Sequence, residues 1–486
     1  MDSAPLALLK ESASSSIDRA LLRFMDSLLV RLRAACGAIL STPPILQCPS
    51  EVFCLLFRWV LCDLEPVTQE YRVQRARLSL VCRFWWKVVI GDAGLWQDVF
   101  VTPSSEAVVL SRVMQLAGSH TLSVYLVDDV PCLRYGASER QLSLLSHFHS
   151  ILPTSARWTR LEVVSTSTYA HKAILDHIGD WNSPALRCLT LRCPSRAALV
   201  TPVPTAVSVS CTNLRRLVLH RCNFPEAFPA SLPNLTVLSL CDLPTIHSPT
   251  RTQLFRLLGS APRLERLELV RVGIRIYPDD PEPVVSRVAI PSVTTLVLAF
   301  NVTLHPARAF FHILEHIEAL NLSHLHLGLP TDSDVKHYLA AHPGLKAPSV
   351  SLAGRFTNSE AVQLLFASFY RVTHLDLVEA DRPSVLRQLG SLRGSLTPLV
   401  LPLLTCLRVR PLHWVALTDG LSARLRVDSA RVQLVLVPHQ GAGRLVPSEH
   451  SSAYHSLMQV VDSATWGEYI HRETQDILRY PGLDAD

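Results

Sequence analysis

One short apolar pattern recurs along most of this 486-residue chain. It is a six-residue run with leucine or another apolar residue at its first, fourth and sixth positions. The last two of these positions alternate as they do on one face of a strand. The runs are LRCLTL (186–191), LRRLVL (214–219), LTVLSL (235–240), LERLEL (264–269), VTTLVL (293–298), IEALNL (317–322), VTHLDL (372–377) and LTCLRV (404–409). Their ends are 21 to 32 residues apart, except for one interval of 55 that a weaker run, SVSL (349–352), divides.

Helical candidates lie between these runs, for example at 170–178, 252–258, 307–314 and 360–369. A strand, a turn and a helix that repeat every 20 to 30 residues are typical of leucine-rich repeats. Each repeat buries its leucines against its neighbours, which predicts an α/β solenoid with a parallel sheet on one face. The Asn/Cys position of such repeats is matched by Cys222 and Asn301 but is occupied by Leu243 and Val272 elsewhere, so we expect an irregular array.

We place this array at residues 119–437, with SHTLSVYLV (119–127) as a cap and VQLVLV (432–437) as its closing strand. Residues 438–486 are expected to form a C-terminal helical tail or cap. The residues between the paired leucines should be exposed on the second face of the sheet. They mix charge and polarity without a stripe, so they favour no class of ligand; they are Thr190, Val218, Ser239, Glu268, Val297, Asn321, Asp376 and Arg408.

The composition narrows the class of protein. Hydrophobic residues make up 48% and charged residues 18%, which excludes an intrinsically disordered chain. No apolar stretch reaches the roughly 18 uninterrupted residues of a membrane span, and the N-terminus lacks the features of a secretory signal. The 12 cysteines include no CxxC pair and often lie beside apolar residues, as Cys82, Cys211, Cys241 and Cys406 do. We therefore expect reduced thiols and a cytoplasmic or nuclear location.

The first 44 residues divide into two parts. Residues 1–16 are small and serine-rich and are expected to be a mobile tail. Residues 17–44 predict an amphipathic helix that ends at Pro43 and Pro44, because apolar residues recur there every three or four positions. This stripe consists of Ile17, Leu21, Phe24, Leu28, Leu32, Ala35 and Ile39.

Residues 45–101 predict a helical domain and carry three recognisable motifs. Cys48-Pro49-Ser50-Glu51-Val52 corresponds to the Leu-Pro-x-Glu-Ile/Leu of F-box domains, with cysteine in place of the usual leucine. Leu80-Val81-Cys82-Arg83-Phe84-Trp85 matches the family's L-V-C-R-x-W, and Gly94-Leu95-Trp96 matches its closing L-W. With the repeats that follow, the chain resembles the F-box proteins that are expanded in mushroom-forming fungi.

This resemblance implies a function. F-box helices bind the Skp-type adaptor of a cullin–RING ubiquitin ligase, and the repeats hold the protein to be ubiquitinated. The implied partner-binding residues are Pro49, Val52, Phe53, Leu56, Leu80, Val81, Trp85 and Trp96. A small domain with several tryptophans has more apolar surface than its core can bury, which favours a partner site. Packing of the tryptophans against the first repeats is the alternative, and a repeat scaffold that never engages a ligase is the alternative function.

Other motifs are weaker. His312-Ile-Leu-Glu-His316 fits the H-x-x-E-H pattern of a zinc hydrolase, but it runs directly into a strand expected at Ile317. His324 and His326 are expected in a loop. Arginines at 72, 75, 77 and 83 and Lys87 alternate with aromatic residues, but helical spacing spreads them over several faces, which favours solvated side chains over a nucleic-acid site. We predict no enzyme activity, no cofactor and no metal.

Overall fold

A computed structural model of the chain describes a set of residue ranges that divides into two compact units, Met1–Glu162 and Val163–Asp486. The described residues are Ser27, 48–62, 64, 69–128, 137–165, 171, 174, 185–193, 212–222, 224, 232–243, 248–275, 288–299, 316–329, 331–341, 347–354, 356–380, 383–390, 401–410, 413–427, 431–437 and 451–466. The predicted tail at 1–16 and the predicted helix at 17–44 lie outside these ranges, apart from Ser27.

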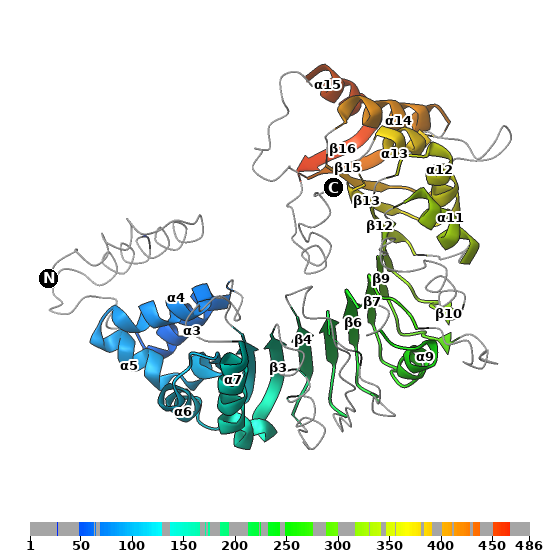
Figure 1. Cartoon of the computed structure of the whole chain (residues 1–486). Helices are drawn as coiled ribbons and strands as arrows, with labels where there is room; N and C mark the ends of the chain where they lie inside the picture. The colour runs from blue at the N-terminus through cyan, green and yellow to red at the C-terminus, as the bar shows by residue number, and fades with distance from the viewer. Residues whose placement is uncertain are drawn as a thin grey trace. The chain divides into compact units, whose positions relative to one another are not determined.

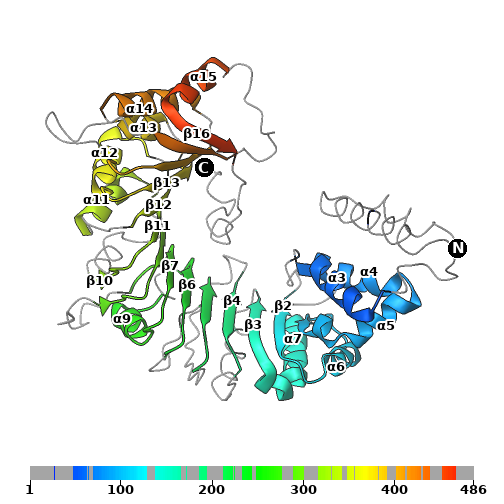
Figure 2. The ribbon, with the colours of Figure 1, turned by 180° about the vertical axis from the view of Figure 1, so that it is seen from behind.

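The first unit begins with three helices, α3 (Ser50–Cys62), α4 (Gln69–Leu80) and α5 (Arg83–Gly91). Figure 2 shows them lying together. The start of α3 follows Pro49, whose carbonyl accepts a hydrogen bond from the Val52 N–H at 3.1 Å. Phe53, Phe57 and Leu61 recur every four residues and therefore form one buried face of α3. They pack with buried residues of α4 and α5, so the predicted helical domain has a core of its own.

The strands of the first unit start earlier than the sequence indicated. A 3₁₀ turn at Ala93–Trp96 leads directly into β1 (Asp98–Val101), which pairs in parallel with β2 (Leu122–Val127). The sheet therefore begins inside the segment expected to be helical, and 119–127 contains its second strand. Between these strands lies α6 (Ala107–Leu116), and α7 (Ala137–Ile151) with a second 3₁₀ turn (Leu152–Arg157) precedes β3 (Trp158–Val164).

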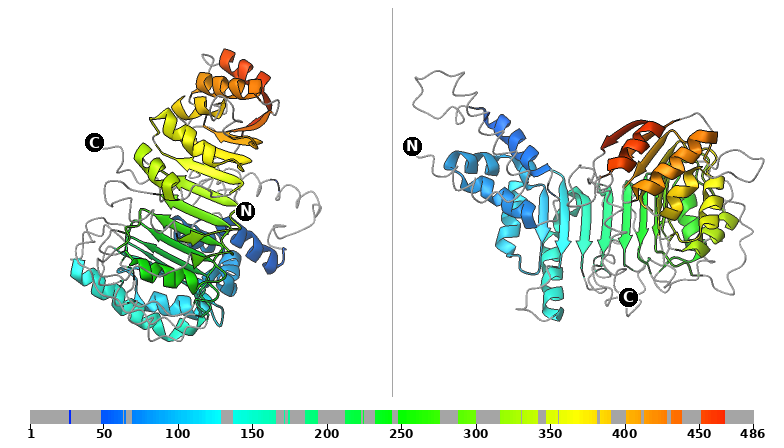
Figure 3. Two further views of the ribbon diagram at one scale, coloured as in Figure 1. Left: turned by 90° about the vertical axis from the view of Figure 1, so that its right-hand side faces the viewer. Right: turned by 90° about the horizontal axis from the view of Figure 1, so that it is seen from above.

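In the second unit the strands form an open parallel sheet in which chain neighbours are also spatial neighbours. Figure 3 shows these strands side by side. They are β4 (Cys188–Arg192), β5 (Arg216–His220), β6 (Val237–Cys241), β7 (Arg266–Val270), β9 (Thr295–Ala299), β11 (His324–Gly328), β12 (Ser349–Ala353), β13 (His374–Glu379), β14 (Cys406–Val409), β15 (Val432–Leu436) and β16 (Val461–Trp466). A separate pair consists of β8 (Val288–Ala289) and β10 (Ile317–Glu318).

The described helices of this unit lie along one face of its sheet (Figure 1). Leucines of successive strands point to this face in register, and Leu240, Leu269, Leu298 and Leu327 follow one another at intervals of 29 residues. The helices are α9 (Arg251–Gly259), α11 (Asp332–Ala341), α12 (Ser359–Ser368), α13 (Pro383–Arg387), α14 (Trp414–Val427) and α15 (Ser451–Val460). The predicted α/β class with a large, open, parallel sheet is thus confirmed, and the arrangement is solenoid-like.

Three details correct the sequence analysis. The run at 317–322 does not supply a strand of the large sheet; its first two residues form β10, which pairs with β8. The overlapping run Leu322–Leu327 supplies β11, because only Leu325 and Leu327 fall in register with Leu296 and Leu298. His324 and His326 therefore lie on a strand and not in a loop. The sheet also continues beyond residue 437, since β16 pairs with β15 inside the region expected to be a helical tail. The weak run at 349–352 does form a strand, β12.

Within the described ranges, no helix has the length and apolar character that crossing a bilayer requires.

Candidate functional site

The fold of the first unit buries one of the eight predicted partner-binding residues and leaves three more half-buried. Phe53 belongs to the core with 1% of its surface exposed, so it can support a binding surface but not form one. Trp85 is half-buried, with its ring centroid 4.8 Å from that of Phe57. Trp96 is also half-buried, and its indole N–H donates to the carbonyl oxygen of Val89 at 2.7 Å. Leu56 is half-buried on α3.

The other four predicted residues are exposed. Pro49 and Val52 lie at the start of α3, and Leu80 and Val81 lie where α4 ends and α5 has not yet begun. Leu80 has 80% of its surface in solvent, the largest exposed fraction among the large apolar residues of the described ranges. Single exposed apolar residues are common on protein surfaces, but Leu80 and Val81 are adjacent, and a contiguous exposed apolar patch indicates a surface that another molecule covers.

The turn between α4 and α5 explains why Leu80 and Val81 point outward. Cys82 is extended, with φ −161° and ψ 170°, and caps α5: its Sγ accepts the backbone N–H of Trp85 at 3.5 Å. The Cys82 carbonyl accepts the Trp86 N–H at 3.0 Å. Leu80 is the last residue of α4, and Val81 lies between the two helices. We call Leu80, Val81 and the exposed Trp86 the α4–α5 corner.

Basic side chains surround this corner in the sequence. Arg77, Arg83 and Lys87 are exposed, and residues 71–91 contain no acidic residue. A binding partner should therefore bring an apolar centre with carboxylates around it, because such charges steer association and fix the orientation of a complex.

Helical spacing predicted that the side chain of Arg75 is solvated, but the structure places it against the ring of Trp96. Its guanidinium carbon lies 4.9 Å from the ring centroid of Trp96, and its Nη1 donates to the carbonyl oxygens of Leu95 and Asp98 at 3.2 Å each. Burial lowers the pKa of Arg75. Tyr71 of the same helix donates to Asp98 at 2.8 Å. These contacts fasten α4 to the start of β1, so Arg75 has a structural role.

The exposed side of α3 carries a second apolar stripe, of which the motif comparison included only Val52 and Leu56. Val52, Leu55, Leu56 and Trp59 have the spacing i, i+3, i+4 and i+7, which puts them on one face. Leu55 is 65% exposed and Trp59 52% exposed. We call these four residues the α3 stripe. The same spacing in the sequence could have identified it, but the family motif directed attention to other positions.

The second face of the sheet is less accessible than predicted over β4 to β9. Thr190, Val218, Ser239, Glu268 and Val297 are all buried. A small apolar cluster explains this, because Cys241, Val270, Val297 and Ala299 are buried on the same side of their strands as this row. Asn321 lies in an exposed turn before β11, and His326 takes its place in the row. Asp376 and Arg408 are half-buried and paired at 3.2 Å.

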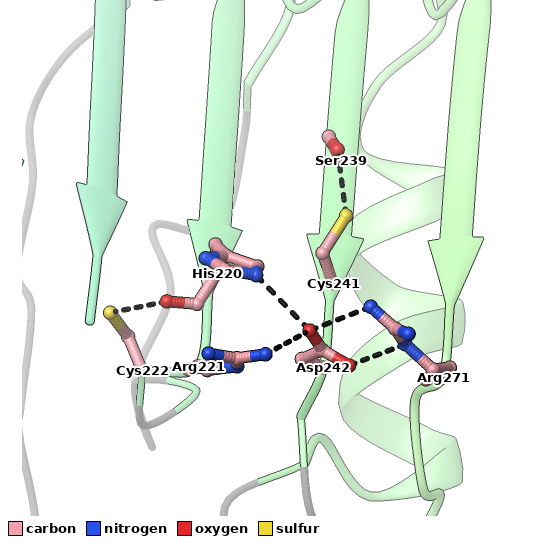
Figure 4. Close-up of polar contacts among 7 residues, drawn as sticks. All are labelled: His220, Arg221, Cys222, Ser239, Cys241, Asp242 and Arg271. Atoms are coloured by element: carbon pink, nitrogen blue, oxygen red, sulfur yellow. Dashed lines mark hydrogen bonds and ion pairs between the residues drawn. The ribbon is translucent and has the colours of Figure 1, made fainter. Parts of the chain in front are cut away.

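A buried ionic cluster joins three neighbouring strands of the second unit (Figure 4). Arg221, Asp242 and Arg271 each follow directly after a strand, and each has a positive φ of 52–55°. This left-handed turn costs a non-glycine residue roughly 1–2 kcal/mol. The backbone N–H groups of these three residues nevertheless extend the hydrogen bonding of the sheet. Each donates to the carbonyl oxygen of the last residue of the next strand, at 2.7–2.9 Å.

The side chains of these residues meet at one carboxylate. Asp242 Oδ2 lies 3.2 Å from Arg221 Nη2 and 3.1 Å from His220 Nε2, and Asp242 Oδ1 lies 2.5 Å from Arg271 Nε. Burial alone would raise the pKa of Asp242, but the hydrogen bond from His220 and the two guanidinium groups hold it below its usual value. The sequence contains a signal for this cluster. Arg221, Asp242 and Arg271 each lie two residues after the end of a leucine run, and their charges alternate from one run to the next.

The hydrolase motif gains no support as a ligand set. His312 lies outside the described residues, and the ring of His316 packs 6.0 Å from that of Phe255. Among the described residues, no three His, Cys, Asp or Glu side chains are placed to hold a metal ion.

No family model matches the chain, and no curated protein sequence is significantly similar to it.

Proposed function

We propose that this chain is the substrate-receptor subunit of a cullin–RING ubiquitin ligase. In this proposal residues 45–101 are an F-box that binds a Skp-type adaptor, and the parallel sheet belongs to leucine-rich repeats that bind the target protein. The observation that carries the proposal is the α4–α5 corner. The segment that matches the F-box motif best, Leu80 to Trp85, exposes its first two apolar residues, while the rings of Phe84 and Trp85 pack against the core of the first unit.

The exposed apolar residues of the α4–α5 corner are of the kind that contributes most to the binding free energy of a protein interface. A few aliphatic or aromatic residues usually carry most of the affinity of a protein interface, and truncating one costs about 2–4 kcal/mol. Leu80 and Val81 lie at a helix end that Cys82 holds in place, so little ordering is needed when a partner covers them. The exposed Arg77, Arg83 and Lys87 add long-range attraction to an acidic adaptor surface.

The accessible part of the repeats suggests where the target binds. Over β4 to β9 the residues between the paired leucines are buried, whereas His326, Ser351, Asp376 and Arg408 on β11 to β14 are partly exposed and adjacent in register. The target protein would contact this polar row. The row offers both charge signs, so it does not define the sequence of the target.

The test is a binding titration of the full-length chain with a Skp-type adaptor. Leu80→Asp should weaken binding roughly 30- to 1000-fold, which corresponds to a loss of about 2–4 kcal/mol. Val108→Asp is the matched control, because Val108 on α6 is 79% exposed but lies outside the motif. The control should bind within about threefold of the parent chain, since a surface substitution away from the interface changes little.

A second variant tests the motif from its other end. Pro49→Ala combined with Val81→Ala should also abolish adaptor binding, while circular dichroism shows that the sheet of the second unit stays folded. No measurable affinity of the parent chain for the adaptor would refute the ligase proposal and leave the repeat scaffold as the function.

A further inference from the structure

Two residues of each leucine run lie between its first and fourth positions, and at the start of β5 both are arginines. The flanking Leu214 and Leu217 are 2% and 1% exposed, whereas Arg215 is exposed and Arg216 is half-buried. The carbonyl oxygen of Arg187, at the start of β4, accepts the N–H of Arg215 at 2.7 Å and the N–H of Arg216 at 2.9 Å. As in a β-bulge, two consecutive residues therefore stand opposite one residue of the neighbouring strand, and both reach solvent.

The charge at these paired positions is confined to the first strands of the second unit. On β4 to β7 the pairs are Arg187-Cys188, Arg215-Arg216, Thr236-Val237 and Glu265-Arg266. On β9 to β14 the corresponding pairs contain no Asp, Glu, Lys or Arg; they are Thr294-Thr295, Ser323-His324, Pro348-Ser349, Thr373-His374 and Thr405-Cys406. The arginines are therefore a local patch and not a general feature of the repeats.

Arg263 adds another guanidinium group to this patch. It is exposed in the turn before β7, and its Nη1 donates to Asn234 Oδ1 at 2.9 Å. The Asn234 Nδ2 in turn donates to the carbonyl oxygen of Thr212 at 2.9 Å. Because Thr212 lies three residues before Arg215, these two bonds direct the Arg263 side chain from β7 back toward β5. We call this patch the arginine edge; it consists of Arg187, Arg215, Arg216, Arg263 and Arg266.

The arginine edge carries an excess of positive charge. In the described part of the same leucine runs, its acidic neighbours are the exposed Glu265 and the buried Glu268, and Glu268 is paired with Arg266. Five arginines and two carboxylates leave a formal charge of +3. Arg187 and Arg215 are exposed, so their guanidinium groups are open to a partner of opposite charge.

The surroundings of the arginine edge favour a protein as the partner. Residues 185–193, 212–222, 232–243 and 260–270 include no Phe, Tyr or Trp, and none of their large apolar residues is exposed. Proteins that bind single-stranded nucleic acids stack the bases on aromatic side chains, and helices that bind membranes insert apolar ones. An acidic protein segment needs neither, and the planar guanidinium fork matches the geometry of a carboxylate.

The spacing of the strands favours several separate carboxylates over one anion. From β4 to β7 there are three strand spacings of about 4.8 Å, or roughly 14 Å in total. An extended peptide rises about 3.3 Å per residue, so side chains at alternate positions lie on one side and about 6.6 Å apart. Three acidic residues at alternate positions therefore span about 13 Å, which is close to the width of the arginine edge.

We propose that the arginine edge binds an extended acidic segment of a partner protein, which crosses β4 to β7 with carboxylates at alternate positions on Arg187, Arg215 and Arg263. This surface is separate from the polar row on β11 to β14 and from the α4–α5 corner. Binding here requires neither the adaptor nor the target of the proposed ligase, so it does not depend on the proposed function.

The test is fluorescence anisotropy of the full-length chain with a labelled peptide that carries three glutamates at alternate positions. Arg187→Glu combined with Arg215→Glu should weaken binding about tenfold or more, because two attractions become repulsions. Arg256→Glu combined with Arg426→Glu is the matched control, since both arginines are exposed on helices α9 and α14 and the change in net charge is the same. The control should bind within about twofold of the parent.

A charge swap tests whether complementarity decides the binding. A peptide with lysines in place of the three glutamates should bind the double variant at the arginine edge and not the parent chain. Circular dichroism of both variants serves as the folding control. No affinity of the parent for the glutamate peptide, an equal loss in the control, or no binding of the lysine peptide to the folded double variant would overturn the proposal.

Two further probes test the class of partner. Oligothymidylate, and a peptide with a single phosphoserine in place of the three glutamates, should each bind more weakly than the glutamate peptide. Tighter binding of the oligonucleotide that the double variant loses would make the partner a nucleic acid. Tighter binding of the phosphopeptide that the double variant loses would replace the carboxylates by one phosphate. Either result would overturn the proposal.

Discussion

Arg58 of α3 donates hydrogen bonds to both carboxylate oxygens of Asp92, from Nε at 3.1 Å and from Nη2 at 2.5 Å. Asp92 follows α5, so this pair ties the first helix to the end of the third. The Asp92 carboxylate also accepts the Gly94 N–H at 3.0 Å. A Cβ on Gly94 would overlap the Arg58 guanidinium, so a larger residue there would require this side chain to shift from its place against Asp92.

The Arg58–Asp92 pair predicts an acid-sensitive first unit. Burial acts to raise the pKa of Asp92, but the hydrogen bonds from Arg58 and Gly94 outweigh it and lower the pKa. The folded state therefore binds this proton less readily than the unfolded state. The stabilisation is present above about pH 4, the ordinary aspartate pKa, and is lost as the pH falls further. Asp92→Asn should remove about 1 kcal/mol at neutral pH, since the side chain of Arg58 is half-exposed.

Tryptophan fluorescence is a suitable probe for this prediction. Five of the eight tryptophans, Trp59, Trp85, Trp86, Trp96 and Trp158, lie in the first unit. Urea unfolding at pH 7 and pH 3 should differ less for Asp92→Asn than for the parent chain. An equal difference would show that Asp92 does not contribute to the pH dependence.

Removal of Asp242 should destabilise the second unit far more than removal of Asp376. Asp242→Ala leaves Arg221 and Arg271 without their shared counter-charge in a buried place, which costs about 3–5 kcal/mol. Asp376→Ala breaks one partly exposed pair with Arg408 and should cost about 1 kcal/mol or less. Thermal unfolding followed by circular dichroism compares the two, and equal losses would contradict a central role for the cluster.

His220 should make the second unit less stable at mildly acidic pH. Burial lowers its pKa, although the nearby Asp242 acts in the opposite direction. The unfolded chain therefore takes up a proton near pH 6.5 that the folded chain refuses, and stability falls as the pH drops from 7 through this value. His220→Gln should flatten this dependence between pH 7 and pH 5.5. Urea midpoints over this range, with His324→Gln at an exposed position of β11 as the control, provide the measurement.

The cysteines should be free thiols with very different reactivities. Titration of the denatured chain should find close to 12 thiols, and several stable disulfides would contradict this. In the native chain Cys82 is exposed and should react before Cys222 and Cys241, which are buried. Burial raises the pKa of Cys222 and raises that of Cys241 to about 12, so little reactive thiolate is present at either. Timed alkylation with peptide mass spectrometry gives the order.

Metal content should not depend on the H-x-x-E-H motif. Replacing His312 and His316 together by alanine should leave metal content and partner binding unchanged, because His316 packs on Phe255 beside the short strand β10. Elemental analysis of parent and double variant is the measurement. Stoichiometric zinc in the parent that is lost in the variant would instead support a metal site.

The sequence by itself determined most strands of the leucine runs, because alternation of leucines is a local property, but it did not predict β1 or β16. Runs such as 186–191 and 264–269 predicted β4 and β7. Where two runs overlap at Leu322, local pattern cannot choose between them. The choice is made by register with the neighbouring strands, and that depends on residues 25 to 30 positions away.

Only the tertiary structure decided which side chains reach solvent. Helical spacing is compatible with a solvated Arg75, but the aromatic rings that bury it come from the segment at 96–100. The leucine frame predicts that Glu268 faces away from the helices, but its burial depends on the apolar cluster formed by β6, β7 and β9. His220, Arg221, Asp242 and Arg271 meet only because successive strands stack in register, so that residues 21 and 29 positions apart become neighbours. The burial of a side chain and its charge partners depend on residues that are distant in the sequence, so a local sequence pattern cannot predict them.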